Sequence, residues 1–477
     1  MKTNRLAMAF VLMAVCASAG AQTSYDAAKL YEEDLNGTSR YIGMGGAMGA
    51  LGSDLSVISH NPAGIGTYRK CDFNGSLSFF GTTTATKPKT SQSSPIMANG
   101  FTYYSGVNMS DINCAFDNMG IVLSGSDGGD NYLNFAFAYR KTHKLDRTID
   151  YYDSFADNQG YEVWRDYLNM ENNVTNTFDM NISYNLSDLV YLGWTFEMLG
   201  TRNESNATFS DYYEAGNHPA YTGRYYVTGA DWVTSSKGAG LNMSFGLIVR
   251  PVSPLRLGIA IKSPTRYKQE LTYEDWDGMF EEQTVGESSK STNYIFKSPW
   301  SLDFSAGLTY GKSALGVEFE RHFTQRSSLT VDNIRMMSQG AMDYKDYSVF
   351  KIGFEQNINN LSFRAGYNYR GSMYNENEVP FMYDSSFNGW AKDGTGAVSE
   401  VGRFDTQTDR RESTRNCTLG IGYCSEPDYD GTQFYVDLAY VYGRRYSNMR
   451  LNELDEDITA RYLTSSHKVQ VTVGWNF

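Results

Sequence analysis

The chain has 477 residues and a formal net charge of −13, with 41 Lys and Arg against 54 Asp and Glu. This acidic balance argues against a nucleic acid partner, which would require a basic face. Tyr (36), Phe (26) and Gly (45) are abundant, Pro (10) is scarce and mean hydropathy is −0.46, a composition that fits an aromatic-rich barrel with a polar interior better than a soluble core of Leu, Ile and Val.

A secretory signal peptide is predicted over residues 1–21. Lys2 and Arg5 precede an apolar stretch over residues 6–17, and residues 19–21 form an A-x-A cleavage site. The stretch is too short to cross a bilayer as a helix, and no run of about 20 apolar residues follows it, which argues against helical spans. Lipidation of Cys16 is a less favoured alternative, because the residues before it are a poor approach to a lipidated cysteine.

Residues 22–70 do not read as strands, and we expect them to form a compact N-terminal segment. They contain a predicted short helix over residues 25–35, a glycine-rich run over residues 40–54, and the sequence Asn61-Pro62-Ala63-Gly64. Pro62 fixes its own φ and restricts Asn61, whereas Gly64 permits conformations closed to other residues. Taken alone, this sequence also fits a plain turn into the first strand.

Residues 71–477 predict an all-β fold, a transmembrane antiparallel β-barrel of about 14 strands. Apolar and polar residues alternate with period two, as in strands with one lipid-facing and one lumenal wall. The predicted strands include residues 73–83, 116–124, 133–139, 178–184, 192–198, 241–249, 255–261, 300–310, 315–319, 350–354, 361–369, 419–423, 434–440 and 469–477. A lumen of this width needs a plug, and residues 22–70 are the natural candidate for a lumenal hatch.

Tight and long connections alternate between these strands. The tight ones are residues 126–130, 186–189, 251–254, 311–313, 357–360 and 425–431, and the long polar ones are 142–175, 200–240, 263–299, 323–346, 371–415 and 443–466. Outer-membrane barrels have short periplasmic turns and long extracellular loops. The pattern therefore predicts the outer membrane of a Gram-negative bacterium as the location, with both termini in the periplasm.

The last strand ends the chain on an aromatic residue. Val469, Val471, Val473, Trp475 and Phe477 share one face. We predict that Trp475 and Phe477 face lipid and form an assembly signal for the barrel assembly machinery.

These motifs, in this order, resemble the FadL/TodX family of outer-membrane transport proteins. The glycine-rich run leading to Asn61-Pro62-Ala63 resembles the family's hatch, and residues 255–264 and 347–369 are similar to its later strands. The resemblance implies passive, hatch-gated uptake of hydrophobic compounds such as long-chain fatty acids, with Asn61, Pro62, Ala63 and Gly64 in the gate. The solute would be held first by extracellular loops, then by a lumenal pocket, and would leave through a gap made by hatch rearrangement or a kinked strand. No enzyme activity and no cofactor are implied, and the solute itself stays open.

Charged residues are predicted to face the lumen. They include Asp179, Glu197, Arg250, Arg256, Asp303, Glu318, Lys351, Arg364, Arg370 and Asp437. Arg250, Arg256 and Arg364 are candidate contacts for a substrate carboxylate. The favoured alternative is an ion-pair network that braces a wet barrel.

Apolar residues in the predicted loops are candidates for a first binding groove. Trp232, Trp276, Phe280, Met336 and Met337 form this candidate loop groove. Packing of loop against loop to cap the barrel is an equal alternative.

Other function classes are less favoured. His60 suggests a haem-related receptor, but the histidines are scattered. The cysteines lack metal-binding spacing, so no metal site is predicted. An outer-membrane lipid hydrolase would need a nucleophile motif that is not seen. An assembly or secretion partner remains an alternative to a transporter.

Overall fold

The structure is a computed structural model that describes residues 30–88, 96–98, 101–103, 107–109, 112–156, 160–220, 222–278, 286–331, 334–335, 345–373, 389–392, 398–401, 413–450 and 459–477. The predicted signal peptide, residues 1–21, lies outside this part of the chain. So do the candidate groove residues Phe280, Met336 and Met337.

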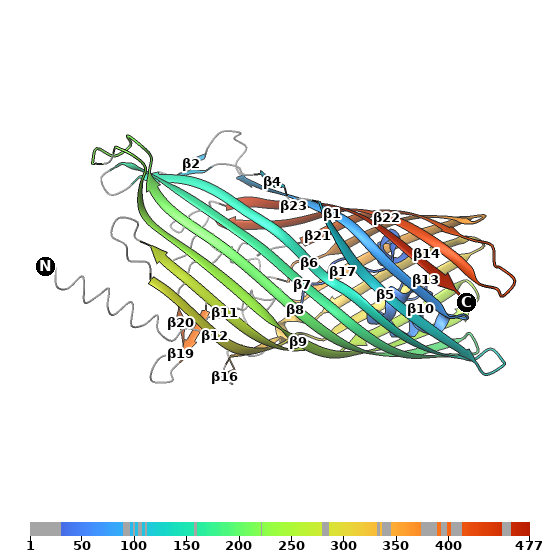
Figure 1. The fold of residues 1–477 in the computed structure, drawn as a ribbon. Coiled ribbons are helices and arrows are strands. Elements are labelled where there is room, and N and C mark those ends of the chain that lie inside the picture. The colour runs from blue at the N-terminus through green and yellow to red at the C-terminus, as the bar shows by residue number, and fades with distance from the viewer. Residues whose placement is uncertain are drawn as a thin grey trace.

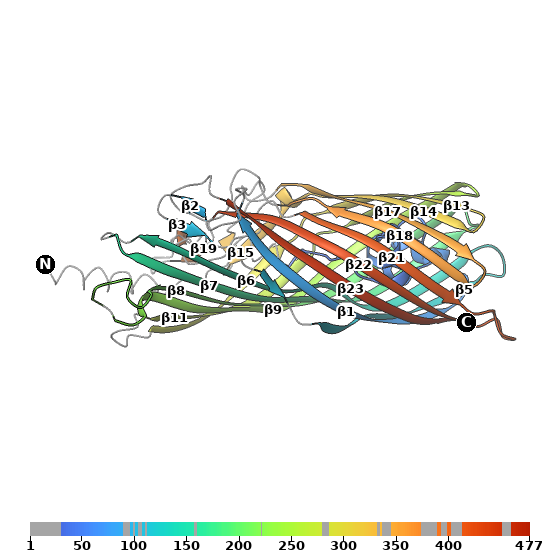
Figure 2. The same ribbon diagram turned by 90° about the horizontal axis from the view of Figure 1, so that it is seen from above.

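Fourteen antiparallel strands form a closed barrel, as the sequence predicts (Figures 1 and 2). In order around the barrel they are β1 (Asp72–Pro88), β5 (Asn113–Ser126), β6 (Tyr132–Ala156), β7 (Glu162–Leu186), β8 (Val190–Tyr213), β9 (Tyr225–Val252), β10 (Leu255–Lys262), β13 (Ser301–Tyr310), β14 (Ser313–His322), β17 (Tyr347–Ile358), β18 (Leu361–Arg370), β21 (Ser413–Cys424), β22 (Gln433–Arg450) and β23 (Thr459–Asn476). β1 pairs with β23, Asp72 opposite Asn476, which closes the ring.

Shorter strands extend or flank this ring. β11 (Arg266–Gly278) follows β10 and pairs with β9, and β12 (Gly286–Lys297) precedes β13 and pairs with β11. The remaining ones are β2 (Ile96–Ala98), β3 (Phe101–Tyr103), β4 (Val107–Met109), β15 (Ser328–Val331), β16 (Ile334–Arg335), β19 (Gly389–Lys392) and β20 (Val398–Val401).

The two faces of the strands differ as period-two alternation predicts. On β6, Leu133, Phe135 and Phe137 are exposed on the outer wall, whereas Asn134 and Ala136 between them are fully buried. An apolar outer wall around a polar interior is the architecture of barrels that span outer membranes. Among the described residues, no helix has the length and apolar character needed to cross a membrane.

All six predicted tight turns are confirmed. Two of them place residues other than glycine at positive φ, namely Ser187 (51°), Asp188 (59°) and Asn359 (53°). These turns and the chain end Phe477 gather at one end of the barrel (Figure 1). The four described cysteines, Cys71, Cys114, Cys417 and Cys424, are free.

The predicted long loops are partly wrong. Most of residues 142–175 and 200–240 continue as paired strands, so β6 has 25 residues and β9 has 28. Beyond the apolar band neither face needs apolar side chains, so the alternation disappears while the backbone hydrogen bonds continue. These strands extend well past their neighbours (Figures 1 and 2).

Residues 30–70 lie inside the barrel, where they form three short helical turns: α3 (Ser39–Gly43), η2 (Leu55–Ser59) and η3 (Pro62–Thr67). Thr38, Asp54 and Asn61 cap them, each side chain accepting a hydrogen bond from a backbone N–H of the first turn. The predicted helix over residues 25–35 is wrong in its described part, because residues 30–35 are not helical.

Candidate functional site

Four lumen-facing glycines form a row across four neighbouring strands. They are direct cross-strand partners in the order Gly307, Gly316, Gly353 and Gly366 on β13, β14, β17 and β18. The backbone of residues 44–51 lies on this row. A Cβ at Gly316 would lie 1.9 Å from the carbonyl oxygen of Ala47, and one at Gly366 would lie 2.2 Å from the nitrogen of Gly45. Only a strand without side chains at these positions lets another backbone approach so closely.

A second pair of glycines holds the Asn61-Pro62-Ala63 sequence. Gly193 on β8 is the cross-strand partner of Gly246 on β9. A Cβ at Gly193 would lie 2.2 Å from the carbonyl carbon of Pro62, and one at Gly246 would lie 2.1 Å from Oδ1 of Asn61. The Asn61 side chain in turn accepts a hydrogen bond from the N–H of Ala63 at 3.2 Å. Pro62, Ala63 and Gly64 are likewise buried, and their role in gating stays a prediction.

An ion-pair network joins the middle of the segment to the barrel wall. Arg40 binds Glu355 on β17 through two nitrogens, at 2.9 and 3.1 Å. Arg364 on β18 donates to the same carboxylate at 2.6 Å and also contacts Asp437 on β22. Glu355, Arg364 and Asp437 are buried. Arg40 therefore takes part in a charged network that also links three barrel strands.

The other two candidate arginines also bind protein groups. Arg256 donates to the carbonyl oxygen of Leu51 at 2.6 Å, and so supports the segment. Arg250 lies near the tight turns, where it contacts Ser253 and Asp188. Contact of Arg250, Arg256 or Arg364 with a ligand stays a prediction, while the contacts observed are those of a bracing network.

The start of the described segment is held by side chains from separate strands. Glu32 pairs with Arg445 on β22 at 3.2 Å, Glu33 with Lys262 on β10 at 2.9 Å, and Asp34 with His143 on β6 at 2.9 Å. These long-range ion pairs accompany a backbone that is not helical at residues 32–34, and tertiary contacts of this kind override a local preference for helix.

Two cavities lie on opposite sides of residues 36–41. The one away from the tight turns has a volume of about 190 Å³, and Asn36 and Tyr41 line it. The other, toward the tight turns, has a volume of about 250 Å³, and Thr38 and Arg40 line it. Residues 36–41 therefore separate two spaces within one lumen.

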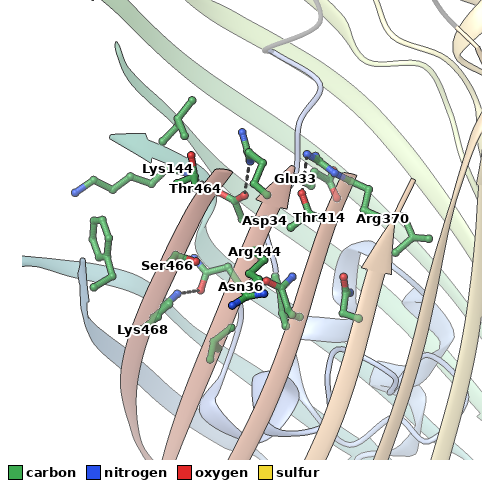
Figure 3. Close-up of a pocket in the computed structure, with 18 of the residues that line it drawn as sticks. Glu33, Asp34, Asn36, Lys144, Arg370, Thr414, Arg444, Thr464, Ser466 and Lys468 are labelled. Carbon is green, nitrogen blue, oxygen red and sulfur yellow. Dashed lines mark hydrogen bonds and ion pairs between the residues drawn. The ribbon is translucent and has the colours of Figure 1, made fainter. Parts of the chain in front are cut away.

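The first cavity combines apolar and charged walls. Its lining includes Leu35, Tyr41, Phe80, Leu145, Val349 and Val441, and also Glu33, Asp34, Asp117, Lys144, Arg370, Arg444, Arg445 and Lys468. Figure 3 labels six of these charged residues, Glu33, Asp34, Lys144, Arg370, Arg444 and Lys468, together with Asn36. Lys144 places its ammonium 4.3 Å from the centre of the Phe80 ring. Arg250, Arg256 and Arg364 do not line this cavity.

A β-bulge in the wall adjoins this cavity. β5 pairs Asn118 with Ser76 and Phe116 with Leu77, so Asp117 is an extra residue without a partner in the ladder. Its carboxylate lies 3.3 Å from the ammonium of Lys468, and both residues line the cavity. The wall is therefore irregular where the cavity meets β1 and β5.

The predicted loop groove is not assembled from loops in the described residues. Trp232 and Trp276 belong to the paired strands β9 and β11, where Trp232 lies opposite Asp275 and Trp276 opposite Asp231. Placing these two tryptophans in loops was wrong, for the reason given above for the long strands. A binding role for them stays a prediction.

Sequence reasoning missed the glycine row and the bulge, although the first left a signal. On each of the four strands a glycine stands between two residues predicted to face outward: residues 306–308, 315–317, 352–354 and 365–367. A lumenal glycine on four successive predicted strands indicates close approach of another backbone.

No protein-family model matches the sequence, and no curated protein matches it. Among solved structures, the chain is similar in fold to a Pseudomonas aeruginosa FadL homologue, with 13% identity and a TM-score of 0.58 over 93% of this chain and 99% of that chain. It is also similar to TodX, a toluene transporter of P. putida, with 13% identity and a TM-score of 0.54 over 93% of this chain and 99% of that chain. A third similar structure is CymD, a monoaromatic hydrocarbon channel, with 12% identity and a TM-score of 0.51 over 94% of this chain and 99% of that chain. The predicted resemblance to the FadL/TodX fold is confirmed.

Proposed function

We propose that this chain lies in the outer membrane and lets small hydrophobic compounds pass inward down their gradient, with residues 22–70 acting as a hatch. The observation that carries this proposal is the pair of cavities separated by residues 36–41. A compound in the first cavity can pass to the second cavity, or out through the barrel wall, only if those residues or their neighbours move. The periplasmic position of the tight turns and of Phe477 is part of the proposal.

The volume of the first cavity favours a ring-sized solute over a long chain. An engineered apolar cavity of about 150 Å³ holds benzene, and this cavity measures about 190 Å³. Phe80, Leu145, Val349 and Val441 give it apolar walls. TodX and CymD, whose folds are similar, are described as handling toluene and monoaromatic hydrocarbons. We therefore propose monoaromatic-sized compounds as the substrate class, with long-chain fatty acids as the alternative.

The bulge at Asp117 suggests a way out through the wall. It lies beside the first cavity, and the extra residue weakens the β1–β5 ladder there. The Lys468–Asp117 ion pair and the hydrogen bond from Lys468 to Asn36, at 2.9 Å, join this part of the wall to the segment. Movement of Asn36 would therefore alter the wall at the same place.

The test fills the first cavity from β22, at a position that packs with Ile42 of the segment but takes no part in the ion pairs that hold it. Val441 is buried and lines the cavity, so Val441→Trp should abolish uptake of labelled toluene by whole cells while the barrel still folds. Val436→Trp, which lies on the outer wall of β22 with exposed Leu438 and Tyr440 and is not in the cavity lining, controls for the addition of Trp to this strand and should transport normally. Equal uptake by the parent and Val441→Trp would contradict the proposal.

A second measurement addresses the hatch. Deleting residues 22–70 should raise single-channel conductance in planar bilayers toward that of an open pore, because a lumen of this width is not closed by its own side chains. Replacing Asn61, Pro62 and Ala63 should leave a folded barrel that loses uptake. Unchanged conductance after the deletion, with unchanged uptake after the replacement, would favour an assembly or secretion role instead.

A further inference from the structure

A cluster of four metal-ligating side chains lies at the junction between the segment and the barrel wall. One ligand atom from each of His60, Asp303, Glu318 and Glu320 lies within 4.8 Å of all the others. His60 immediately precedes Asn61 in the segment, whereas Asp303 belongs to β13 and the two glutamates to β14. His60 and Glu320 also line the first cavity, whereas Asp303 and Glu318 do not.

The burial of Asp303 is not explained by its contacts within the protein. It is 6% exposed, and within the described part of the chain neither carboxylate oxygen has a hydrogen-bond partner. Its side chain is directed at Glu318, Glu320 and His60, as their mutual distances require. A buried carboxylate without a donor is costly unless a cation or a proton satisfies it.

The charges of the cluster do not balance. Lys351 contacts Glu318 at 2.6 Å and also binds Glu320. In the described residues, Asp303 has no ion-pair partner, and the other side chains paired with Glu320 are His60 and His322. With neutral histidines and all three carboxylates ionised, the one ammonium would leave two negative charges in a buried space, which is the charge that one divalent cation neutralises.

The surroundings hold the ligands in place and leave room. His60 stacks on Tyr41 with ring centres 5.6 Å apart and directs Nδ1 at Glu320, 3.2 Å away. The N–H of Gly49 donates to Oε2 of Glu318 at 2.8 Å. A cavity of about 30 Å³ adjoins His60, Asp303 and Glu320, which exceeds the roughly 10–15 Å³ that one water requires.

We propose that His60, Asp303, Glu318 and Glu320 bind one divalent transition-metal ion, which links the hatch segment to strands β13 and β14. One imidazole nitrogen with three carboxylate oxygens suits Zn²⁺ or Mn²⁺ better than the all-oxygen shells of Ca²⁺ and Mg²⁺. Bonds of about 2.0–2.2 Å place ligand atoms up to about 4.4 Å apart, so the observed spacing requires only small side-chain movements. Lys351 would shift from between the two glutamates.

The test is metal binding by the purified, folded full-length barrel in detergent, treated with a chelator and then dialysed. Titration with ZnCl₂ in a calorimeter should show one ion per chain, and X-ray absorption at the zinc edge should show a nitrogen and oxygen shell without sulfur. Asp303→Asn and His60→Gln should each weaken binding at least tenfold. Glu270→Gln, which removes an exposed carboxylate paired with Lys237, should bind as the parent does.

A shift in the gel mobility of unheated samples shows whether each variant is folded. Absence of stoichiometric Zn²⁺ and Mn²⁺ binding by the parent would overturn the proposal, whatever the variants do, and would favour a proton shared by Asp303 and Glu318. Equal binding by the folded Asp303→Asn variant and the parent would overturn it too. The measurement is independent of transport, so a protein that carries no hydrophobic solute still tests it.

Discussion

Gly353 faces the backbone carbonyl of Met44 so closely that a Cβ on the glycine would lie 2.1 Å from that oxygen. The contact requires the segment to move if any side chain is introduced. Gly353→Val should therefore displace residues 44–47 while the strand itself, which favours Val, still forms. We expect a folded barrel with raised conductance in planar bilayers.

Gly200→Val is the matched control for this prediction. Gly200 lies on β8, and a Cβ there would meet nothing within 4 Å. It should conduct as the parent does. Parental conductance in the Gly353→Val variant would mean that the segment is not held by this close approach.

Arg40 and Arg364 share Glu355, but their removal should have different effects. Arg364→Met leaves Asp437 buried without its charged partner, and breaking a buried pair costs about 3–5 kcal/mol. Arg40→Met leaves Glu355 still paired with Arg364, so it should free the segment at a smaller cost to the barrel. The unfolding temperature should fall most for Arg364→Met, and conductance should rise for Arg40→Met.

The order of these two effects is the informative result. A larger loss of thermal stability in Arg40→Met than in Arg364→Met would show that the segment, rather than the wall, depends most on the network.

Phe477 closes the barrel through its backbone. Its N–H donates to the carbonyl of Cys71 at 2.9 Å, and its carbonyl accepts from the N–H of Cys71 at 3.0 Å. Its side chain is half exposed on the outer wall. Deleting Phe477 should lower the yield of folded barrel in cells, measured by gel mobility before and after heating. A normal yield would mean that the terminal residue is not an assembly signal.

Asp188 should make stability depend on pH at the tight-turn end. Burial alone would raise the pKa of its carboxyl, but hydrogen bonds from Tyr191 and Arg69 lower the pKa below its ordinary value. A lowered pKa in the folded state adds stability above the ordinary pKa of about 4, and that stability is lost as the pH falls through the folded value.

Asp188→Asn should therefore lower the unfolding temperature at about pH 7 and make no difference at about pH 2. Thermal unfolding of the parent and the variant at both pH values measures this. An effect of the same size at both would show that the charge of Asp188 is not its cause.

The sequence predicts the strands because the two walls of the barrel meet different surroundings. Phe135 and Phe137, which face outward, flank Ala136, which faces inward, and this alternation can be recognised in the sequence of a single strand. Where the contrast ends, as in residues 142–156, the backbone pairing persists without a side-chain pattern. Strand length was therefore underestimated.

Sites formed by residues that lie far apart in the sequence could not be predicted from local sequence patterns. Asp303 and Glu318 were predicted to face the lumen, and they do. Their meeting with His60 depends on how the segment lies across the barrel, which the period of no single strand encodes. The same holds for Arg256, because its hydrogen bond to Leu51 could not be predicted from the sequence around either residue.

The length of β6 to β9 has a consequence for where a solute first meets this protein. A tilted strand crosses a bilayer with about 9–11 residues, and β6 has 25. At roughly 3.3 Å per residue, the remaining 14 or so extend the strand by about 45 Å along its own direction. In the proposed orientation, the extended parts of these four strands lie outside the membrane and form one continuously hydrogen-bonded sheet. An apolar molecule approaching from that side would then meet a sheltered protein wall before it reached lipid.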